Sequence, residues 1–504
     1  MLLAQSESTN RTDGAITPEL LQKLQQATPK APAERALHNS IVQNGMVLAN
    51  AELATPPDDH FTYRVPTKGI TDQKQSGRCW LFTGFNVLRA QFIKDNNLGE
   101  FYFSHCYSFF WDQLEKANLF LEGILETRTL PITDRKVEWL FQHPINDGGQ
   151  FTGISDNLLK YGVVPSDVMP ETYSSNNTSR LSSLIAKLLR QGGMELRSKA
   201  QQGATLAELR KDKETTLQAI YRLLCLNLGT PPTTFEYTLR DADGKVLSTK
   251  EYTPLSFYQE HIGVNLKDDY VMIMNDPSQP YYETYAIEYD RHAWDGKDWT
   301  YINLPMEEIK KMAIASLKDD YVMIMNDPSQ PYYETYAIEY DRHAWDGKDW
   351  TYINLPMEEI KEMAIASLKD GNMMYYSCDV GKELNKESGL LTLGYDDYEA
   401  ITGVPMTMTK GERIASFDSG STHAMTLVAV DLDKSGKPTK WMVENSWGAT
   451  SGHQGHLIMT DEWFDAYTFR LVVHKKYLTP RAKELQGKTP RLLPPWSPMF
   501  RAEE

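Results

Sequence analysis

A tandem duplication is the sequence feature that most restricts how this chain can fold. Residues 267–317 and 318–368 are the same 51-residue segment, except that Lys311 in the first copy corresponds to Glu362 in the second. Each copy predicts a strand, a turn with the sequence Asn-Asp-Pro-Ser-Gln-Pro, a second strand, a loop and a helix. A solenoid is the usual explanation for a repeat of this period, but only two copies exist, and ordinary repeats diverge. We therefore expect a single native position that only one copy can fill, with the duplication arising from slippage between matching Leu-Lys-Asp ends or from sequence assembly.

A second feature is a cysteine at the start of a predicted helix. In the segment 72–82 a glycine-containing turn leads into Cys79, and apolar residues with helical spacing follow. A helix N-terminus carries positive partial charge and unpaired N–H groups, which favour the thiolate that attacks carbonyl carbons. An isolated cysteine is more often a small buried hydrophobe, and we assign that role to Cys106, Cys225 and Cys378.

A hairpin near the C-terminus is expected to bring a histidine and an asparagine together. His423 opens an apolar run, turn residues follow at 433–438, and a second run ends at Asn445. A direct antiparallel pair of these two residues centres the turn at Lys434, so the asparagine can orient the imidazole. Cysteine, histidine and asparagine in this order, with Gln73 upstream, are the parts of a papain-like acyl-transfer site.

Six motifs along the chain resemble, in order, those of the bleomycin hydrolase and aminopeptidase C family, a cytosolic and self-compartmentalised branch of the papain superfamily. They occupy residues 73–80, 147–150, 378–382, 422–425, 443–448 and 459–464. The resemblance implies an α+β fold of the papain-like two-lobed cysteine peptidase type, with a helical insertion and N- and C-terminal arms. It also implies a single segment of the kind that is duplicated here.

The resemblance assigns a role to each of four catalytic residues. Cys79 would attack the peptide carbonyl, and His423 would be its base. Asn445 would orient the histidine, and Gln73 would help to form the oxyanion hole together with the Cys79 backbone N–H.

Four further residues are assigned to substrate binding. Gly148 and Gly149 would lie beside the substrate backbone, where a side chain would obstruct it, although a double glycine is also typical of a simple turn. Trp447 would shield the Asn–His hydrogen bond from water or serve only as a core residue. In the family a C-terminal tail enters the cleft and its carboxylate holds the substrate amino group. Here Glu504 or its neighbour Glu503 would supply that carboxylate, although Ser497 replaces an aspartate and Phe500 a glycine of the family tail.

The expected organisation has seven segments. They are a disordered terminus (1–14), an N-terminal arm (15–71), a helical lobe with the nucleophile (72–179), a helical insertion for oligomerisation (180–266), the duplicated segment (267–368), a β-rich lobe with His and Asn (369–479) and a C-terminal tail directed to the active site (480–504).

Composition narrows the functional class and the compartment. The net charge of −16 argues against a general affinity for nucleic acid. The chain has no apolar run long enough to span a membrane and no secretory pattern at its start. Four cysteines cannot form a disulfide scaffold, and Ser76 stands where secreted papain relatives often carry a disulfide cysteine. Both observations favour a reducing cytoplasm.

The sequence thus predicts a cytoplasmic cysteine aminopeptidase that hydrolyses N-terminal residues of peptides. It needs no metal or organic cofactor, and its partners are peptide substrates. The family resemblance implies a homohexamer, while the charge and the lack of long apolar runs argue against nucleic-acid and membrane partners. Three alternatives remain open: a cysteine endopeptidase or oligopeptidase of the same fold, an inactive scaffold or nucleic-acid-binding relative, and a duplicated chain that misfolds.

Overall fold

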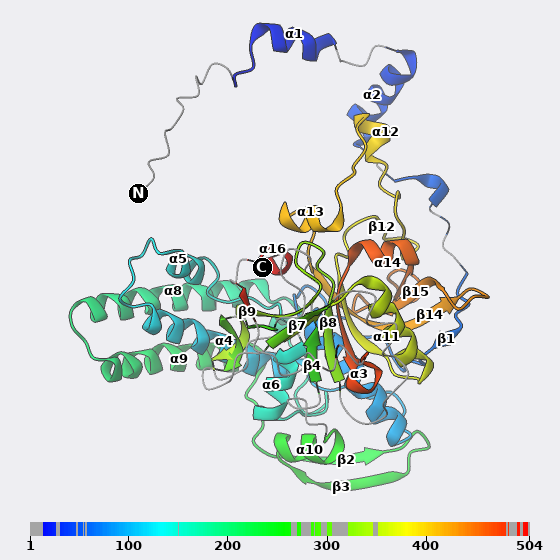
Figure 1. Cartoon of the computed structure of the whole chain (residues 1–504). Coiled ribbons are helices and arrows are strands. Elements are labelled where there is room, and N and C mark those ends of the chain that lie inside the picture. The colour runs from blue at the N-terminus through cyan, green and yellow to red at the C-terminus, as the bar shows by residue number, and fades with distance from the viewer. Residues whose placement is uncertain are drawn as a thin grey trace.

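A computed structural model gives the fold of the chain (Figure 1). It describes residues 14–26, 31–46, 49–53, 55, 58–149, 151–263, 270–273, 284–286, 288–293, 300–304, 321–345, 351–479, 482, 491–493 and 497–501. The predicted disordered terminus, apart from Gly14, and the terminal Glu504 lie outside the described residues.

The N-terminal arm carries two helices that stand apart from the body of the molecule (Figure 1). These are α1 (Pro18–Gln26) and α2 (Pro32–Asn44), and neither has a buried residue. The backbone N–H of Leu20 donates to Thr17 Oγ1 at 3.2 Å, so the Thr17 side chain caps the start of α1. The arm continues through η1 (Ala51–Leu53) to β1 (Tyr63–Arg64), which pairs with a strand of the β-rich lobe.

The helical lobe is built around α3, the helix that starts at Cys79. Its helices are α3 (Cys79–Asp95), α4 (His105–Glu126), α5 (Arg135–Gln142), α6 (Phe151–Tyr161) and α7 (Tyr173–Asn176). Buried side chains occur all around α3, including Trp80, Leu81, Phe85 and Phe92. A helix that is apolar on every side belongs inside the molecule, and α3 accordingly packs between α6 and the strands of the other lobe.

The predicted helical insertion also contains a hairpin. Helices α8 (Ser179–Gln201) and α9 (Leu206–Leu228) pack side by side, and β2 (Phe235–Arg240), β3 (Val246–Tyr252) and α10 (Pro254–His261) follow (Figure 1). The turn between β2 and β3 is held by Asp241, whose carboxylate accepts from the backbone N–H groups of Asp243 and Lys245. Gly244 adopts φ +81° there, a conformation that glycine tolerates best. An aspartate turn between two β-prone runs explains why this part is not helical.

The β-rich lobe is a single twisted sheet with helices packed against it. Its strands follow the order β17-β11-β14-β15-β16-β13-β12. They are β11 (Met374–Cys378), β12 (Leu384–Asn385), β13 (Leu390–Leu391), β14 (His423–Leu432), β15 (Pro438–Glu444), β16 (His456–Thr460) and β17 (Thr468–His474). The accompanying helices are α11 (Met357–Lys369), α12 (Tyr398–Thr402), α13 (Lys410–Ala415), α14 (Asp461–Tyr467) and η3 (Lys475–Tyr477), and the chain ends with β18 (Arg491–Leu493) and α16 (Pro498–Arg501).

Each copy of the duplicated segment forms strands at equivalent positions. The first copy contributes β4 (Tyr270–Ile273), β5 (Thr284–Ala286), β6 (Glu288–Ala293) and β7 (Thr300–Leu304), and the second contributes β8 (Tyr321–Met325), β9 (Tyr333–Trp345) and β10 (Thr351–Asn354). One long strand of the second copy, β9, corresponds to β5 and β6 of the first. Ile273 pairs with Ile302 in the first copy just as Ile324 pairs with Ile353 in the second. The antiparallel partners of β7 and β10 are also equivalent. Identical sequences therefore reach the same local pairing twice.

The second copy occupies the position next to the β-rich lobe. Strand β8 pairs with β17, and α11 buries Ile360, Met363 and Leu368 in the core of that lobe. The other edge of β8 is shared, because β4 of the first copy and β10 of the second both pair with it. We expected only one copy to find a place in the fold, but the described strands of the first copy extend the sheet. An edge strand exposes unpaired backbone groups, and a second copy of the same segment can satisfy them.

Candidate active site

Cys79 is the first residue of α3, as predicted. The residue before it, Arg78, is fully buried and ion-pairs with Glu171 at 2.9 Å. The Arg78 Nε also donates to Ser76 Oγ at 3.0 Å. A buried charge is stable only when it is paired, so these contacts hold the turn that aims the thiol.

A loop from the helical lobe fixes the same turn. Asp147 Oδ2 accepts a hydrogen bond from the backbone N–H of Gly77 at 2.7 Å and another from the Thr178 hydroxyl. The Trp80 indole donates to the Asp147 carbonyl at 3.0 Å. A Cβ on Gly77 would stand 2.3 Å from Asp147 Oδ1, and therefore only glycine permits this close approach.

Gln73 is held by the β-rich lobe. Its Oε1 accepts from the Ser446 hydroxyl at 2.5 Å, and its backbone N–H donates to the Ser446 carbonyl at 2.8 Å. Its Nε2 donates to the Ser76 carbonyl at 2.6 Å. An amide nitrogen carries two hydrogens, so the second remains for an oxyanion.

His423 and Asn445 are joined by a buried hydrogen bond. His423 Nε2 lies 2.9 Å from Asn445 Oδ1. The backbone N–H of Ser446 donates to the same oxygen at 2.8 Å, which identifies that atom as the acceptor. The histidine therefore carries its proton on Nε2 and keeps Nδ1 as the basic nitrogen.

The hairpin that carries this pair is present, with a register shifted by two residues from the prediction. At its end nearest the site Thr426 pairs with Glu444 and Leu427 with Val443. If this register is continued beyond the last pair, the residue directly across from His423 is Trp447 and not Asn445. A shift of two residues keeps a side chain on the same face of the sheet, and diagonal neighbours remain within reach. The Asn–His contact therefore survives the shift.

Five of the eight predicted site residues line one cavity of about 260 Å³, and Asn445 lies behind His423 outside the lining. It is lined by Gln73, Gly77, Cys79, Asp147, Gly148, Gly149, Tyr375, Thr422, His423 and Ala424. Lys116 supports its glycine wall, because the Lys116 ammonium donates to the Gly148 carbonyl at 2.5 Å and ion-pairs with Asp112 at 2.9 Å. Trp447 stands outside the lining and stacks on His423, and Glu504 lies outside the described residues.

Burial sets the ionisation of the two central groups. Burial raises the pKa of the Cys79 thiol to about 11, while hydrogen bonds from the backbone of Ala424 and Trp80 act in the opposite direction. Burial lowers the pKa of His423 to about 4, against the hydrogen bond to Asn445. Desolvation thus opposes the charged form of each group, whereas the start of α3 favours the Cys79 thiolate.

Sequence reasoning missed three supporting residues. Asp147, Ser446 and Lys116 each make the contacts described above, yet none carries a spacing that reveals its partner. Asp147 and Ser446 lie within two of the six motifs, 147–150 and 443–448, and this membership was the available signal, although it assigned them no role. Lys116 offered no signal, because it lies within a long helix and far in sequence from the loop it holds.

The C-terminal segment reaches the neighbourhood of the cavity. The backbone N–H of Ser421 donates to the Met499 carbonyl at 3.1 Å, and Met499 is buried. A second cavity of about 350 Å³ includes Thr422, which also lines the first cavity, and Pro498 of α16. The tail thus ends its described course beside the histidine side of the site.

Two properties of the described part of the chain bear on other functions. None of the helices in this part is both long and apolar enough to cross a membrane. Within the same part, no cluster of three or more His, Cys, Asp or Glu side chains could hold a metal ion.

Comparison with known proteins decides the family. The sequence matches the Peptidase C1-like family over residues 15–320 and again over 318–500. The chain belongs to the Peptidase C1-like family. The two matched stretches meet where the second copy of the duplicated segment begins, as expected if the family has one such segment.

Individual relatives of this peptidase cover nearly the whole chain. Aminopeptidase C of Streptococcus thermophilus is 34% identical over 92% of this chain and 94% of its own length. Bleomycin hydrolase of Homo sapiens is 35% identical over 87% of this chain and 88% of its own. The crystal structure of PepW from Lactobacillus rhamnosis HN001 superimposes with a TM-score of 0.82 at 32% identity, covering 97% of this chain and 99% of that one. These findings confirm the predicted family, the α+β papain-like fold and the cysteine peptidase class.

Proposed function

We propose that this protein is a cysteine aminopeptidase that removes N-terminal residues from peptides through Cys79, His423 and Asn445. The observation that carries this proposal is the hydrogen bond from His423 Nε2 to Asn445 Oδ1. It leaves Nδ1 as the base within the cavity that Cys79 also lines.

The reaction begins with a proton transfer inside the cavity. His423 Nδ1 takes the proton of the Cys79 thiol as the sulfur attacks the peptide carbonyl carbon. The carbonyl oxygen becomes an oxyanion, which accepts hydrogen bonds from Gln73 Nε2 and the Cys79 backbone N–H. Collapse of this intermediate breaks the C–N bond, and His423 donates its proton to the leaving amine. His423 then activates a water that hydrolyses the thioester and restores the thiol.

The tail supports an aminopeptidase over an endopeptidase. Met499 is buried beside Ser421, two residues before His423, and the described helix α16 extends to Arg501. A chain segment in this place would block the passage of a long substrate and leave room for a peptide end. An endopeptidase of the same fold is the second candidate, because Phe500 and the acidic end depart from the tail of the resembled family.

Labelling with a thiol-directed inhibitor tests the nucleophile. We expect E-64 or iodoacetamide to modify Cys79 and to abolish hydrolysis, and Cys79→Ala to be inactive yet folded. Cys225→Ala is the matched control, since Cys225 is also a free and partly exposed thiol. Near-normal turnover by folded Cys79→Ala would end the cysteine peptidase proposal.

Peptides with free and acetylated N-termini test the substrate end. We expect the intact enzyme to prefer free-amine peptides, and removal of residues 500–504 to weaken these while improving acetylated or longer ones. The carboxylates of the acidic end are groups that can bind an ammonium. Equal rates on both substrates before and after truncation would favour the endopeptidase.

We further propose a homohexamer in the cytoplasm. Exposed apolar side chains on α1 and α2, including Leu20, Leu24 and Val42, support assembly through the arm. All four cysteines are free, as suits a reducing compartment. Light scattering should give six chains per particle, and a monomer at micromolar concentration would refute the assembly.

A further inference from the structure

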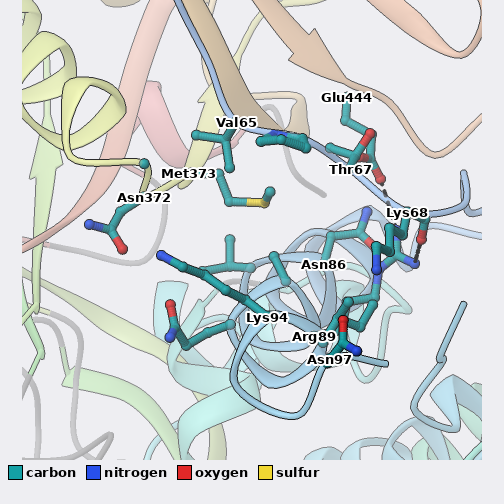
Figure 2. A pocket seen from close by; sticks show the side chains of 16 residues that line it. Val65, Thr67, Lys68, Asn86, Arg89, Lys94, Asn97, Asn372, Met373 and Glu444 are labelled. Carbon is teal, nitrogen blue, oxygen red and sulfur yellow. Dashed lines mark hydrogen bonds and ion pairs between the residues drawn. The ribbon is translucent and has the colours of Figure 1, made fainter. Parts of the chain in front are cut away.

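A larger cavity lies between the helical and β-rich lobes and shares no lining residue with the cavity around Cys79 (Figure 2). Its volume is about 450 Å³, which is enough for a small organic ligand. Four parts of the chain line it. They are residues 65–68 of the N-terminal arm, residues 86–94 of α3 together with Asn97, residues 371–373 after α11, and Glu444 at the end of β15.

One end of this interlobe cavity is polar but internally satisfied. Arg89 ion-pairs with Glu444 at 3.2 Å, and both side chains are almost completely buried. Arg89 also donates to the carbonyls of Lys68 at 2.8 Å and Gly69 at 2.7 Å. Thr67 supplies a further hydrogen bond to the Glu444 carboxylate. The charges of this pair cancel, so it contributes shape and polarity but no net charge.

Two lysines that line the cavity, Lys68 and Lys94, give it a net positive charge. Lys68 Nζ donates to the Leu98 carbonyl at 2.6 Å, which uses one of its three hydrogens. The Lys94 ammonium makes no hydrogen bond or ion pair with any residue that the structure describes. Its charge acts on Asp370, but that carboxylate already binds Lys476 Nζ at 2.5 Å and the Tyr477 hydroxyl at 2.6 Å.

The lysines flank an apolar middle. Figure 2 shows the Lys94 side chain passing below Met373 with its amine on the Asn372 side, whereas Lys68, Arg89 and Glu444 lie at the opposite end. The wall between them is formed by Val65, Val87, Ala90, Ile93 and Met373. Apolar surface between uncompensated cations is complementary to a molecule that has both an apolar chain and a negative charge.

We propose that the interlobe cavity is a binding site for a small organic anion, namely a carboxylate with an apolar chain. Lys94 binds the carboxylate at one end, Lys68 at the opposite end adds to the positive potential of the cavity, and the chain contacts Val65, Ile93 and Met373. The bound molecule contacts both lobes at once and lies apart from the peptide-binding cavity. This site is therefore independent of the proposed peptidase reaction.

Calorimetric titration of the full chain with octanoate tests the proposal. Octanol and octylamine serve as controls of the same chain length: octanol is uncharged, and octylamine carries a positive charge. We expect saturable binding of octanoate at one site per chain, weaker binding of octanol and none of octylamine. In Lys68→Gln/Lys94→Gln the octanoate Kd should rise at least about tenfold, because charge-assisted hydrogen bonds are lost. Lys386→Gln, an exposed lysine outside the cavity, removes a charge elsewhere and should bind normally.

A steric variant provides a second measurement. Ala90→Phe places a ring inside the cavity and should abolish octanoate binding while the helical circular dichroism stays unchanged. If Ala90→Phe fails to fold, the lysine variants still decide, because neither exposed lysine supports the core. Equal affinity for octanoate and octylamine, unchanged affinity in the double lysine variant, or no saturable octanoate binding would each overturn the proposal.

Discussion

The indole of Trp447 stacks on the imidazole of His423, with 5.1 Å between the ring centroids and 28° between the ring planes. The two-residue shift in the β14–β15 register puts Trp447 at the number opposite the histidine. The ring stacks on the side chain whose Nε2 binds Asn445, a position from which we expect it to keep water from competing for that hydrogen bond.

We expect Trp447→Ala to lower kcat/KM by up to roughly tenfold. An aromatic pair contributes about 0.5–1.5 kcal/mol, and 1.4 kcal/mol corresponds to about tenfold. The loss arises because water gains access to the His423–Asn445 hydrogen bond. Trp447→Phe keeps an aromatic ring and should retain most of the activity. Steady-state kinetics on a free-amine peptide measures both, and full activity in Trp447→Ala would contradict the shielding role.

The contact between Ser446 and Gln73 predicts a graded loss of oxyanion stabilisation. Gln73→Ala removes a donor and should lower kcat by about 10²–10³-fold. Ser446→Ala only frees the Gln73 Oε1, so its kcat should fall by roughly tenfold or less, as expected for one hydrogen bond of about 1 kcal/mol. An increase in KM with unchanged kcat in either variant would mean that the residue binds the ground state instead.

Burial of His423 predicts an acid limb of the pH profile below the usual histidine range. Since burial lowers the pKa of His423 to about 4, the imidazole stays an unprotonated base as the pH falls through 6.5. The kcat/KM should therefore fall only as the pH approaches that lower value. The Asn445 hydrogen bond raises this pKa, so Asn445→Ala should move the limb to still lower pH while reducing the maximal rate. A limb at or above pH 6.5 in an enzyme that stays folded would show that the histidine is not desolvated.

Deletion of either repeat copy should give an active enzyme. The two products, lacking 267–317 or 318–368, have the same sequence except for Lys or Glu at the position of Lys311 and Glu362. Since Glu362 is partly exposed, their stabilities should agree within about 0.5 kcal/mol. Both should be at least as stable as the full chain, which must accommodate a second β-rich copy and is more prone to aggregate. Thermal unfolding with activity assays measures this, and unfolding of both products would show that both copies have structural roles.

The buried ion pair between Arg89 and Glu444 predicts a large loss of stability when one partner is removed. Arg89→Met leaves the Glu444 carboxylate buried without its cation, at a cost of about 3–5 kcal/mol. The double variant Arg89→Met/Glu444→Leu should recover most of this, because no unpaired charge remains. Urea unfolding of the three proteins measures the difference. A double variant no more stable than the single one would show that the interaction is more than compensation of a buried charge.

The sequence by itself determined the elements whose signals are local. Helix α3 begins at Cys79 because a glycine turn meets an apolar helical pattern there, and β14 and β15 follow from two apolar runs around a polar turn. The same locality explains why each copy of the duplicated segment forms equivalent strands. The motifs around Gln73, His423 and Asn445 were enough to predict the family, since they recur in a fixed order along the chain.

Only the tertiary structure decided what depends on distant contacts. The bulge between Leu427 and Ala429 in the β14–β15 pairing is not visible in the turn sequence, and the register differs from the prediction by two residues. The hydrogen bond of Ser446 to Gln73 spans the two lobes, so no spacing along the chain reveals it. The desolvation that raises the pKa of Cys79 is also tertiary, because it depends on the residues packed around the thiol and not on the helix start. Tertiary structure also decides which copy pairs with β17. The two segments are nearly identical, so no local difference in sequence could select one of them.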